Sequence, residues 1–497
     1  MKVVKIKFKG RELNFTATSA MPLGRSTGED LSDRSALTEE TPGPGASEER
    51  LSSRPGPRNP CLVPTYERVL GEIPLSLKRG TFISVDREPA LKISAIGFQP
   101  AKSIPELARW FLQKYCDKSA LILDPFCGSG TTLVETLRYG ASIRWLDYNP
   151  LSRLICAVKT QNVDFHRLVE ETNRILLLSE RQKAAQQTIS FANKDFWFQK
   201  PVQEALEILR EHISNAEPRV RNVLWLCLAS TVRKMSDMND GMLLAAKRSH
   251  IEEIPRRSRT DVFNAFGSYV QKATRAIREW QELCGDRFHL AKELAITDAN
   301  GLHTQCDDLK FDAVVTSPPY INAIDYVWAS KFELHWLGLV KDDADRLALY
   351  SKEIGTERIA KEEVRELGRT GHLLLDGLLE EIYTGKRYQA TTSQNRLRSR
   401  VTYKYFADMK RHFETCFRSI NPGGYYCFTI GDRSKICGVD VPVAGLLAEF
   451  AEEAGFRKIF EFHVLLRNRK LNVPRNVAWA GTIKHDTTVV LRKPSPN

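Results

Sequence analysis

The sequence predicts an α/β fold that is built on a parallel sheet and carries helical inserts. A strand-like run at 121–126 is followed by a glycine-rich turn, a helical stretch over 133–139 and a second strand-like run at 142–148. Such a strand–helix–strand unit places its two strands in parallel. Apolar residues at helical spacing, as in VQEALEILREHI, predict helices elsewhere. Further strand-like runs bring the total to seven candidate strands, and they lie at 293–299, 312–319, 423–432, 457–466 and 487–493.

The bulk composition favours a cytoplasmic protein with a polyanionic partner. The 497 residues carry a formal net charge of +12. A basic balance of this size is typical of nucleic-acid-binding proteins, although a basic surface also serves solubility. No apolar run approaches the roughly 20 residues of a membrane helix, and the N-terminus has no signal-peptide core. The 10 cysteines form no Cys-x-x-Cys pair and no zinc-finger spacing, which is typical of reduced thiols.

The turn after the first strand of the βαβ unit has the features of a nucleotide-binding loop. Asp124–Thr132 reads DPFCGSGTT and opens a helix. Its glycines allow a ligand to approach the backbone closely, and the helix start offers free N–H donors. Asp147 ends the next strand, where a carboxylate can accept both hydroxyls of a ribose. The pattern is neither a P-loop, which ends in Gly-Lys-Ser/Thr, nor the dinucleotide Gly-x-Gly-x-x-Gly. A tight turn without a ligand is the structural alternative.

A second motif, Thr316-Ser317-Pro318-Pro319-Tyr320, follows the apolar run DAVVT. The two prolines fix φ and hold the chain extended. Ligands sit at the carboxyl ends of strands in open α/β sheets. Such a stiff loop can hold the Ser317 hydroxyl and a main-chain carbonyl at a set distance from a substrate amine, while Tyr320 offers a π-face to a planar ring. The alternative is a packing turn.

Together these residues resemble the bacterial DNA amino-methyltransferases, which methylate N4 of cytosine or N6 of adenine. DPFCGSGTT is similar to the family's motif I, and TSPPY to its catalytic motif IV. Phe98–Lys102 is similar to motif X, and Asn421–Gly424 to the loop before the fifth strand. The resemblance implies a Rossmann-like, seven-stranded S-adenosylmethionine-dependent methyltransferase sheet with an antiparallel last strand. It also implies that the target base is flipped out of double-stranded DNA.

The resemblance assigns roles position by position. Ser317 and the Pro318 carbonyl would bind the target amine, Pro319 would stiffen the loop, and Tyr320 would stack on the flipped base. Asp147 would bind the ribose of S-adenosyl-L-methionine, and Asp298 its adenine. The other cofactor residues implied are Lys102, Asp124, Phe126, Gly128, Gly130 and Thr131. Asn322 and Asp325-Tyr326 are expected to shape the pocket, although Asp325 could equally be a helix N-cap.

The first residue of the catalytic tetrad bears on the acceptor. In this family a serine there is more usual for cytosine N4 and an aspartate for adenine N6, so Ser317 favours cytosine N4. The alternatives are an N6-adenine enzyme, an RNA or protein-amide methyltransferase, and a catalytically silent nucleic-acid-binding protein on the same scaffold. A restriction-modification or phage-defence setting is expected, with a cognate restriction endonuclease or defence proteins as further partners.

Two basic inserts are candidates for reading DNA. The first contains Lys247–His250 and Arg256–Arg259, and the second contains Lys386–Tyr388 and Arg396–Arg400. Basic residues interleaved with tyrosine suit phosphate contact and base stacking, and a solvated helix face is the alternative for each cluster.

These interpretations divide the chain into seven parts. Residues 1–18 are expected to form a short hairpin, and residues 19–60, rich in Ser, Gly, Pro and Glu, a disordered linker. The remaining parts are the cofactor-binding half of the core at 61–160, a helical insert and possible target-recognition region at 161–290, the catalytic part of the core at 291–330, a helical and basic insert at 331–418, and the C-terminal part of the core at 419–497.

Overall fold

The computed structural model describes residues 3–8, 11–16, 65–87, 89–100, 102–238, 254–294, 309–321, 325–388, 391–466 and 483–495. The chain divides into two units, Met1–Pro64 and Thr65–Asn497. In the first unit, β1 (Val3–Phe8) and β2 (Arg11–Thr16) pair antiparallel. The linker expected at 19–60 lies outside the described residues.

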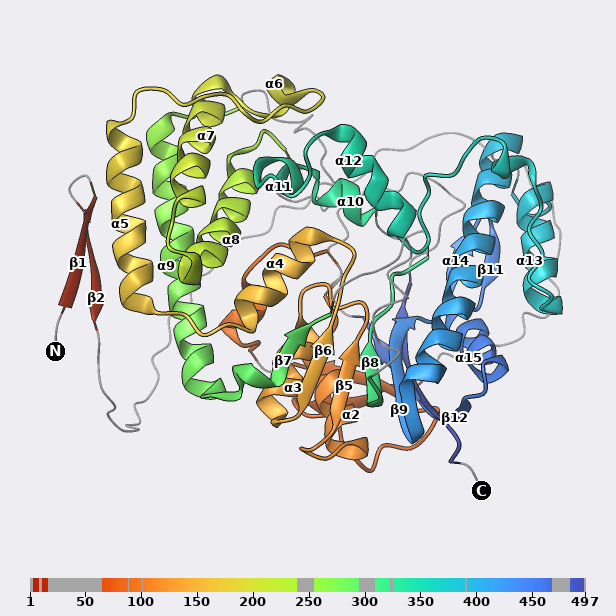
Figure 1. The fold of residues 1–497 in the computed structure, drawn as a ribbon. Helices are drawn as coiled ribbons and strands as arrows, with labels where there is room; N and C mark the ends of the chain where they lie inside the picture. The colour runs from red at the N-terminus through yellow and green to blue at the C-terminus, as the bar shows by residue number, and fades with distance from the viewer. Residues whose placement is uncertain are drawn as a thin grey trace, which may run out of the picture. The chain divides into compact units, whose positions relative to one another are not determined.

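The second unit is organised around one large sheet (Figure 1). The order of its nine strands is β3-β4-β12-β13-β9-β8-β5-β6-β7. All neighbouring strands pair in parallel except β13, which is antiparallel to both β9 and β12. The α/β class with a mostly parallel sheet is therefore confirmed. The strands are β3 (Glu67–Leu70), β4 (Phe82–Asp86), β5 (Leu121–Asp124), β6 (Ser142–Trp145), β7 (Ala291–Glu293), β8 (Phe311–Thr316), β9 (Ile420–Gly431), β12 (Arg457–Leu465) and β13 (His485–Arg492).

The sheet has nine strands where the sequence predicts seven. The two additional strands, β3 and β4, come from a stretch before the first helix that carries no recognised strand pattern. β3 is four residues long and only Val69 in it is buried, so it lacks the alternation that marks a half-buried strand. β3 joins the sheet only by pairing with β4. β4 in turn pairs with β12 through only a few residues, so neither strand has an extended local pattern that marks its place in the sheet. A separate short hairpin of β10 (Ser434–Ile436) and β11 (Val439–Val441) was also not predicted.

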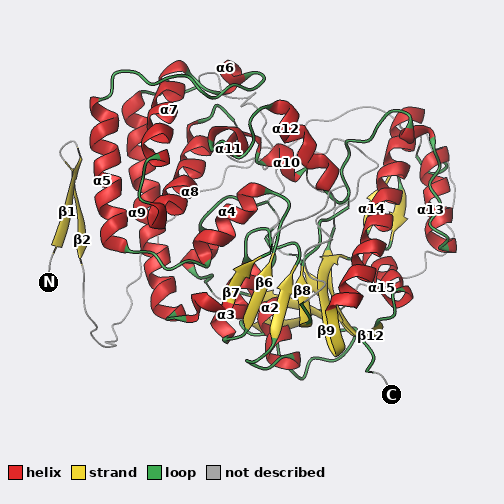
Figure 2. Ribbon diagram, in the orientation of Figure 1, coloured by secondary structure: helices red, strands yellow, loops and turns green. Residues whose placement is uncertain are grey.

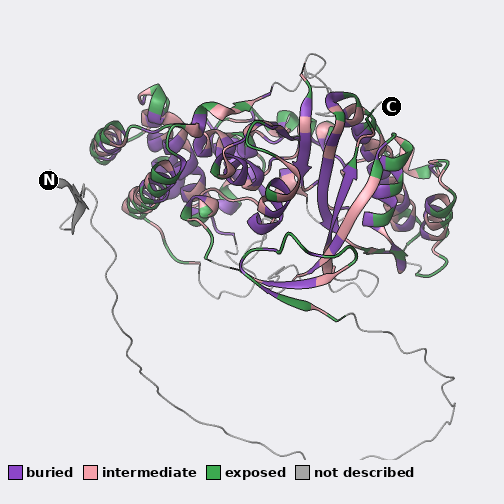
Figure 3. Ribbon diagram, turned by 90° about the horizontal axis from the view of Figure 1, so that it is seen from below, coloured by how far each residue is buried: buried purple, intermediate pink, exposed green. Residues whose placement is uncertain are grey.

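Helices cover both faces of the sheet, as the secondary-structure colouring shows (Figure 2). Successive residues of a strand point to opposite faces. On β5, Ile122 belongs to a core cluster with α2 (Pro105–Tyr115) and α3 (Thr131–Tyr139), while Leu123 belongs to a second cluster with α14 (Thr392–Ser419) and α15 (Val443–Glu453). The central strands, such as β5 and β8, are consequently buried from both sides, and Figure 3 colours the chain by burial.

One group of helices inserted between the strands lies beyond the carboxyl edge of the sheet (Figure 1). It packs four long helices together, α5 (Phe165–Arg181), α7 (Lys200–Ser214), α8 (Pro218–Met235) and α9 (Arg259–Cys284). α9 begins with a capping box in which Ser258 and Asp261 satisfy each other's backbone N–H. None of the described helices is both long and apolar enough to cross a bilayer. The remaining helices are α1 (Lys92–Ala95), α4 (Pro150–Lys159), α6 (Lys194–Trp197), α10 (Tyr326–Ala329), α11 (Lys331–Trp336), α12 (Asp343–Ala348) and α13 (Leu373–Thr384), with short 3₁₀ turns at Arg287–Leu290, Leu349–Lys352 and Glu363–Arg365.

Candidate active site

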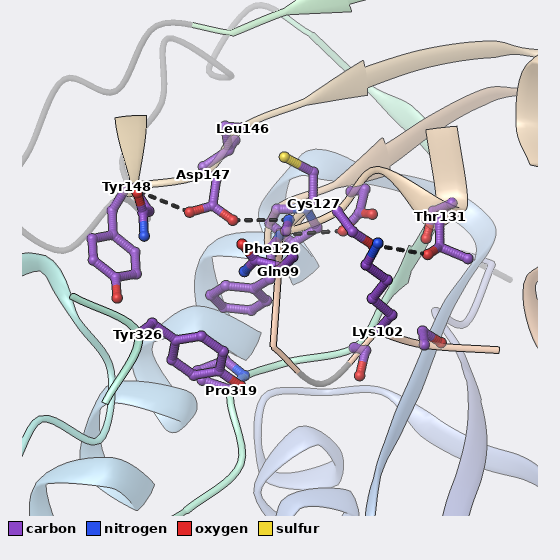
Figure 4. Close-up of a pocket in the computed structure, with 18 of the residues that line it drawn as sticks. Gln99, Lys102, Phe126, Cys127, Thr131, Leu146, Asp147, Tyr148, Pro319 and Tyr326 are labelled. Carbon is purple, nitrogen blue, oxygen red and sulfur yellow. Dashed lines mark hydrogen bonds between the residues drawn. The ribbon is translucent and has the colours of Figure 1, made fainter. Parts of the chain in front are cut away.

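A cavity lies at the carboxyl ends of β5, β6 and β8. The glycine turn after β5 and the Ser-Pro-Pro loop after β8 both contribute to its wall, so the two motifs lie side by side as the sequence analysis requires. Figure 4 shows Tyr148 and Tyr326 toward one end of the cavity, and Lys102 and Thr131 toward the other. The residues that line it include Gln99, Lys102, Asp124, Phe126, Cys127, Gly128, Ser129, Thr131, Asp147, Tyr148, Ser317, Pro319, Tyr326, Lys352 and Ile354.

Asp124 joins the two motifs. Its Oδ1 accepts hydrogen bonds from the Thr316 hydroxyl at 2.7 Å and from the Phe126 backbone N–H at 3.2 Å. Burial raises the pKa of Asp124 to about 6, and the Thr316 hydroxyl opposes this rise by stabilising the ionised form. β5 and β8 are neighbours in the sheet, and Asp124 and Thr316 are their last residues. This side-chain contact therefore holds together the points at which the two functional loops begin.

The glycine turn depends on backbone conformations that favour glycine. Gly128 has φ of 47° and Gly130 has φ of 74°, both in the left-handed region. Gly130 is also the N-cap of α3, and a Cβ at this position would lie 3.1 Å from the Cys156 Sγ. The turn therefore packs tightly against α4 on one side while Gly128 faces the cavity on the other.

Asp147, two residues after the end of β6, is held in place by two backbone N–H groups. Its Oδ2 accepts from Gly128 at 2.9 Å and its Oδ1 from Asn149 at 2.8 Å. Burial raises its pKa to about 6, and these two hydrogen bonds oppose the rise. The carboxylate lines the cavity beside the glycine turn, where it can accept hydrogen bonds from a bound diol.

One lysine supports the glycine turn, and a second lysine lines the cavity. Lys159 is fully buried and its Nζ donates to the Ser129 carbonyl at 2.7 Å, while burial lowers its pKa to about 7. The Lys102 Nζ donates to the carbonyls of Ser94 and Gly97 at 2.9 and 3.3 Å. Lys102 lines the cavity, and burial lowers its pKa. A positive charge at this end suits an anionic group on a ligand.

The Ser-Pro-Pro loop presents an acceptor to the cavity. The Ser317 hydroxyl donates its hydrogen to the Thr429 carbonyl on β9 at 3.0 Å. The oxygen of Ser317 therefore keeps its lone pairs for a donor in the cavity, since a hydroxyl has one hydrogen and two acceptor sites. Ser317 and Pro319 line the cavity. Pro318 is buried, and the half-buried Tyr320 packs against the core cluster that contains the α14 helix.

The structure brings most of the expected site residues into one wall. Among the predicted catalytic and cofactor-binding residues that the structure describes, Pro318, Tyr320 and Gly130 do not line the cavity. Asp298 and Asn322 lie outside the described residues. Tyr326 lines the cavity as expected, whereas Asp325 is the N-cap of α10 and accepts from the Trp328 N–H at 2.7 Å.

Sequence reasoning missed the contribution of the segment around Glu353. Lys352 and Ile354 line the cavity, and Glu353 between them contacts two other lining residues. Nothing local marks this segment, because LYSKEIG carries no motif and no clear periodicity. Only folding brings this segment close to Tyr148 and Tyr326, and this proximity makes it part of the site.

The basic clusters proposed for DNA reading have partners within the chain. Arg257 is half-buried, pairs with Asp237 and donates to the Ser236 carbonyl, while Arg259 donates to the Lys183 carbonyl. In the second insert, Arg398 pairs with Glu357 and Arg400 with Glu363. These arginines join helices to neighbouring segments, so charge runs in the sequence do not by themselves locate a nucleic-acid surface. The cluster at 247–250 lies outside the described residues.

Comparison with known proteins identifies distant relatives over most of the chain. The chain is 22% identical over 417 residues to the Type II methyltransferase M.MvaI of Kocuria varians, a match that covers 79% of this chain and 88% of that protein. It is 22% identical over 419 residues to the Type II methyltransferase M.BsoBI of Geobacillus stearothermophilus, which covers 76% and 81%. A shorter match of 83 residues at 35% identity links 17% of the chain to 16% of the Type II methyltransferase M.MjaII of Methanocaldococcus jannaschii. No protein-family model matches the chain. Over most of its length, the chain is thus similar to Type II methyltransferases.

Proposed function

We propose that this chain is a DNA methyltransferase that transfers a methyl group from S-adenosylmethionine to the exocyclic amine of a flipped base, with N4 of cytosine as the acceptor. The observation that carries the proposal is the shared cavity, in which the glycine turn and the Ser317 acceptor face one space. The Type II methyltransferase relatives and the net charge of +12 support the same reading.

The strand order also supports a Rossmann-like methyltransferase core. If β3 and β4 are set aside, seven strands remain, in the order β12-β13-β9-β8-β5-β6-β7. β13, the last strand in the chain, is the one antiparallel member of the described sheet. This arrangement agrees with the sheet that the resemblance implies, extended by two strands at one edge.

The cavity residues fit the cofactor. Asp147 would accept the ribose hydroxyls, the backbone of the glycine turn would approach the cofactor closely, and Lys102 would lie near its carboxylate. When bound, S-adenosylmethionine supplies an electrophilic methyl group on a sulfonium sulfur.

The Ser-Pro-Pro loop would orient the acceptor amine. Ser317 accepts one amine N–H, because its own hydrogen is already donated to Thr429. The Pro318 carbonyl, fixed by the stiff loop, would accept the second N–H. With both N–H groups bound, the amine lone pair points away from the base plane and toward the cofactor end of the cavity. We favour cytosine N4 over adenine N6 because, in the family that these motifs resemble, a serine at the position of Ser317 is more usual for cytosine N4.

Transfer of a labelled methyl group to duplex DNA, followed by nucleoside analysis of the product, tests the proposal. Ser317→Ala is expected to lower the rate by about tenfold to a hundredfold, the loss of one hydrogen bond in the transition state. Binding of S-adenosylmethionine should change by less than about twofold, because Ser317 faces the acceptor. Ser214→Ala is the matched control, since its hydroxyl also donates to a backbone carbonyl but lies exposed on α7.

Each outcome assigns the reaction. N4-methylcytosine supports the proposal in full, and N6-methyladenine retains the DNA enzyme but changes its acceptor. Label in RNA or in protein, with none in DNA, contradicts the proposed substrate. A Ser317→Ala variant that transfers methyl at the parent rate contradicts the role of Ser317. The similarity to Type II methyltransferases supports a restriction-modification setting, with a cognate endonuclease as a proposed partner.

A further inference from the structure

Glu353 is a buried carboxyl group that the proposed mechanism does not use. It follows the 3₁₀ turn Leu349–Lys352 and is 6% exposed. Its Oε1 accepts a hydrogen bond from the Tyr148 hydroxyl at 2.9 Å and a second from the Tyr326 backbone N–H at 3.2 Å. One carboxyl oxygen therefore contacts two residues that are 178 positions apart in the sequence (326 minus 148).

The two partners of Glu353 belong to the two functional sides of the cavity. Tyr148 directly follows Asp147, on the side proposed for the ribose. Tyr326 begins α10, which follows the Ser-Pro-Pro loop on the side proposed for the acceptor. Both tyrosines line the cavity and lie near each other in Figure 4. The N–H of Tyr326 is one of the donors that a helix start leaves without an intrahelical partner, so Glu353 also fixes the beginning of α10.

A second set of contacts joins the same two segments. The Asn149 Nδ2 donates to the Ser330 Oγ at 3.1 Å, and the Ser330 Oγ donates to the Tyr326 carbonyl at 2.8 Å. Asn149 and Ser330 are both buried. The end of β6 and the helix α10 are therefore linked twice, once through Glu353 and once through Ser330. Repeated buried links of this kind hold side chains in a single geometry.

The contact that Glu353 makes depends on hydrogen bonding more than on charge. Burial, and next the negative charge of Asp325, raise the pKa of Glu353 to about 8. The carboxyl group is therefore mostly neutral at pH 7. A glutamine side chain has the same length and an acceptor oxygen in the same place, so it should reproduce both hydrogen bonds.

We propose that Glu353 is a positioning residue for methyl transfer, which holds Tyr148 on the cofactor side and the start of α10 on the acceptor side at a fixed separation. The inference rests on the proposed function, because it concerns the distance between a bound methyl donor and a bound amine. Small errors in this distance slow a group transfer strongly while leaving ligand binding less affected.

The test compares kcat, the KM for S-adenosylmethionine and the pH dependence of the rate in four variants, with every rate expressed per folded molecule. Glu353→Ala should lower kcat by between about tenfold and a hundredfold and change the KM for the cofactor by less than about threefold. Glu353→Gln should retain kcat within about threefold and keep that rate from pH 6 to 9. Tyr148→Phe should lower kcat less than Glu353→Ala, and the double variant Tyr148→Phe/Glu353→Ala should be no slower than Glu353→Ala alone.

Two controls separate positioning from general stability. Glu207→Ala removes another buried carboxyl that accepts backbone N–H groups, from Thr188 and Ile189, in the helical insert away from the cavity. Tyr383→Phe removes an exposed hydroxyl that donates to the Arg365 carbonyl. Both should keep the parental kcat per folded molecule, although Glu207→Ala is expected to unfold at a lower temperature.

Three results would overturn the inference while leaving the proposed function intact. The first is parental kcat in Glu353→Ala, and the second is a Glu353→Gln variant as slow as Glu353→Ala. If Glu353→Ala does not fold, Tyr148→Phe and Glu353→Gln decide, and the third result is parental kcat in Tyr148→Phe. A wild-type protein that transfers no methyl group to DNA would instead contradict the proposed function itself.

Discussion

The hydrogen bond between Thr316 and Asp124 gives the sharpest prediction, because it connects the two motifs. Thr316→Val keeps the shape of the side chain and removes the hydroxyl that donates to Asp124 at 2.7 Å. Thr316 is 5% exposed and Asp124 is 2% exposed, so water cannot easily replace the lost donor. The remaining partners of Asp124 are the Thr132 hydroxyl and the Phe126 N–H.

The size of the effect follows from the charge of the acceptor. A hydrogen bond to an ionised group contributes about 1.5–3 kcal/mol, and one pKa unit corresponds to about 1.36 kcal/mol. Loss of the Thr316 hydroxyl should therefore raise the pKa of Asp124 from about 6 to between about 7 and 8. In the wild-type protein, affinity for S-adenosylmethionine should fall as the pH drops through about 6, where Asp124 and Asp147 take up protons. In Thr316→Val the same fall should begin at a higher pH.

Calorimetric titration of the cofactor between pH 5 and 9 measures this shift. Thr231→Val is the matched control, because Thr231 is also buried and its hydroxyl donates to the neutral Cys227 carbonyl within α8. The control should lose about 0.5–1.5 kcal/mol of stability, as expected for a neutral hydrogen bond, and should bind the cofactor with the wild-type pH profile. An unchanged profile in Thr316→Val, or an equal shift in both variants, would refute the reasoning.

Two further predictions concern the glycine turn and the pH dependence of folding. Gly130→Ala should cost about 1–2 kcal/mol for the left-handed backbone and also weaken cofactor binding, because the new Cβ would lie 3.1 Å from the Cys156 Sγ. Gly140→Ala is the matched control, because Gly140 is also left-handed, with φ of 95° and ψ of 19°, and its new Cβ would meet only the Lys118 Cδ at 3.9 Å. This control should cause similar strain in unfolding experiments without a binding defect. Glu353 faces Asp325, Glu357 and Tyr148, and its pKa in the folded protein is raised to about 8. The stabilising contribution of its protonated form is therefore present at low pH and is lost as the pH rises through about 8. Melting curves from pH 5 to 9 should therefore show the stability of Glu353→Gln rising relative to the wild type as the pH increases, and a constant difference would contradict the assignment.

The sequence by itself determined the features that depend on neighbouring residues. Six of the seven strand-like runs coincide with strands of the sheet, because apolar strands buried on both faces carry a strong local signal. The seventh, at 293–299, overlaps β7 only at Glu293 and lies outside the described residues from 295 onward. The residues of the glycine turn and of the Ser-Pro-Pro loop are contiguous, so their backbone demands are readable from the letters: glycine for positive φ at 128 and 130, and proline for the extended chain at 318 and 319. Local patterning also placed Asp147 at the end of a strand.

Tertiary structure alone decided which distant residues meet. Glu353 reaches Tyr148 and Tyr326, Thr316 reaches Asp124, and Thr429 takes the hydrogen of Ser317, each across a long separation in sequence. The same holds for β3, whose pairing with β4 compensates for a weak local pattern, and for the basic inserts, whose arginines are paired with carboxylates from other segments. The physical reason is that periodicity and turn chemistry report on the backbone of a segment, whereas hydrogen bonds, burial and pKa depend on partners that only folding brings near.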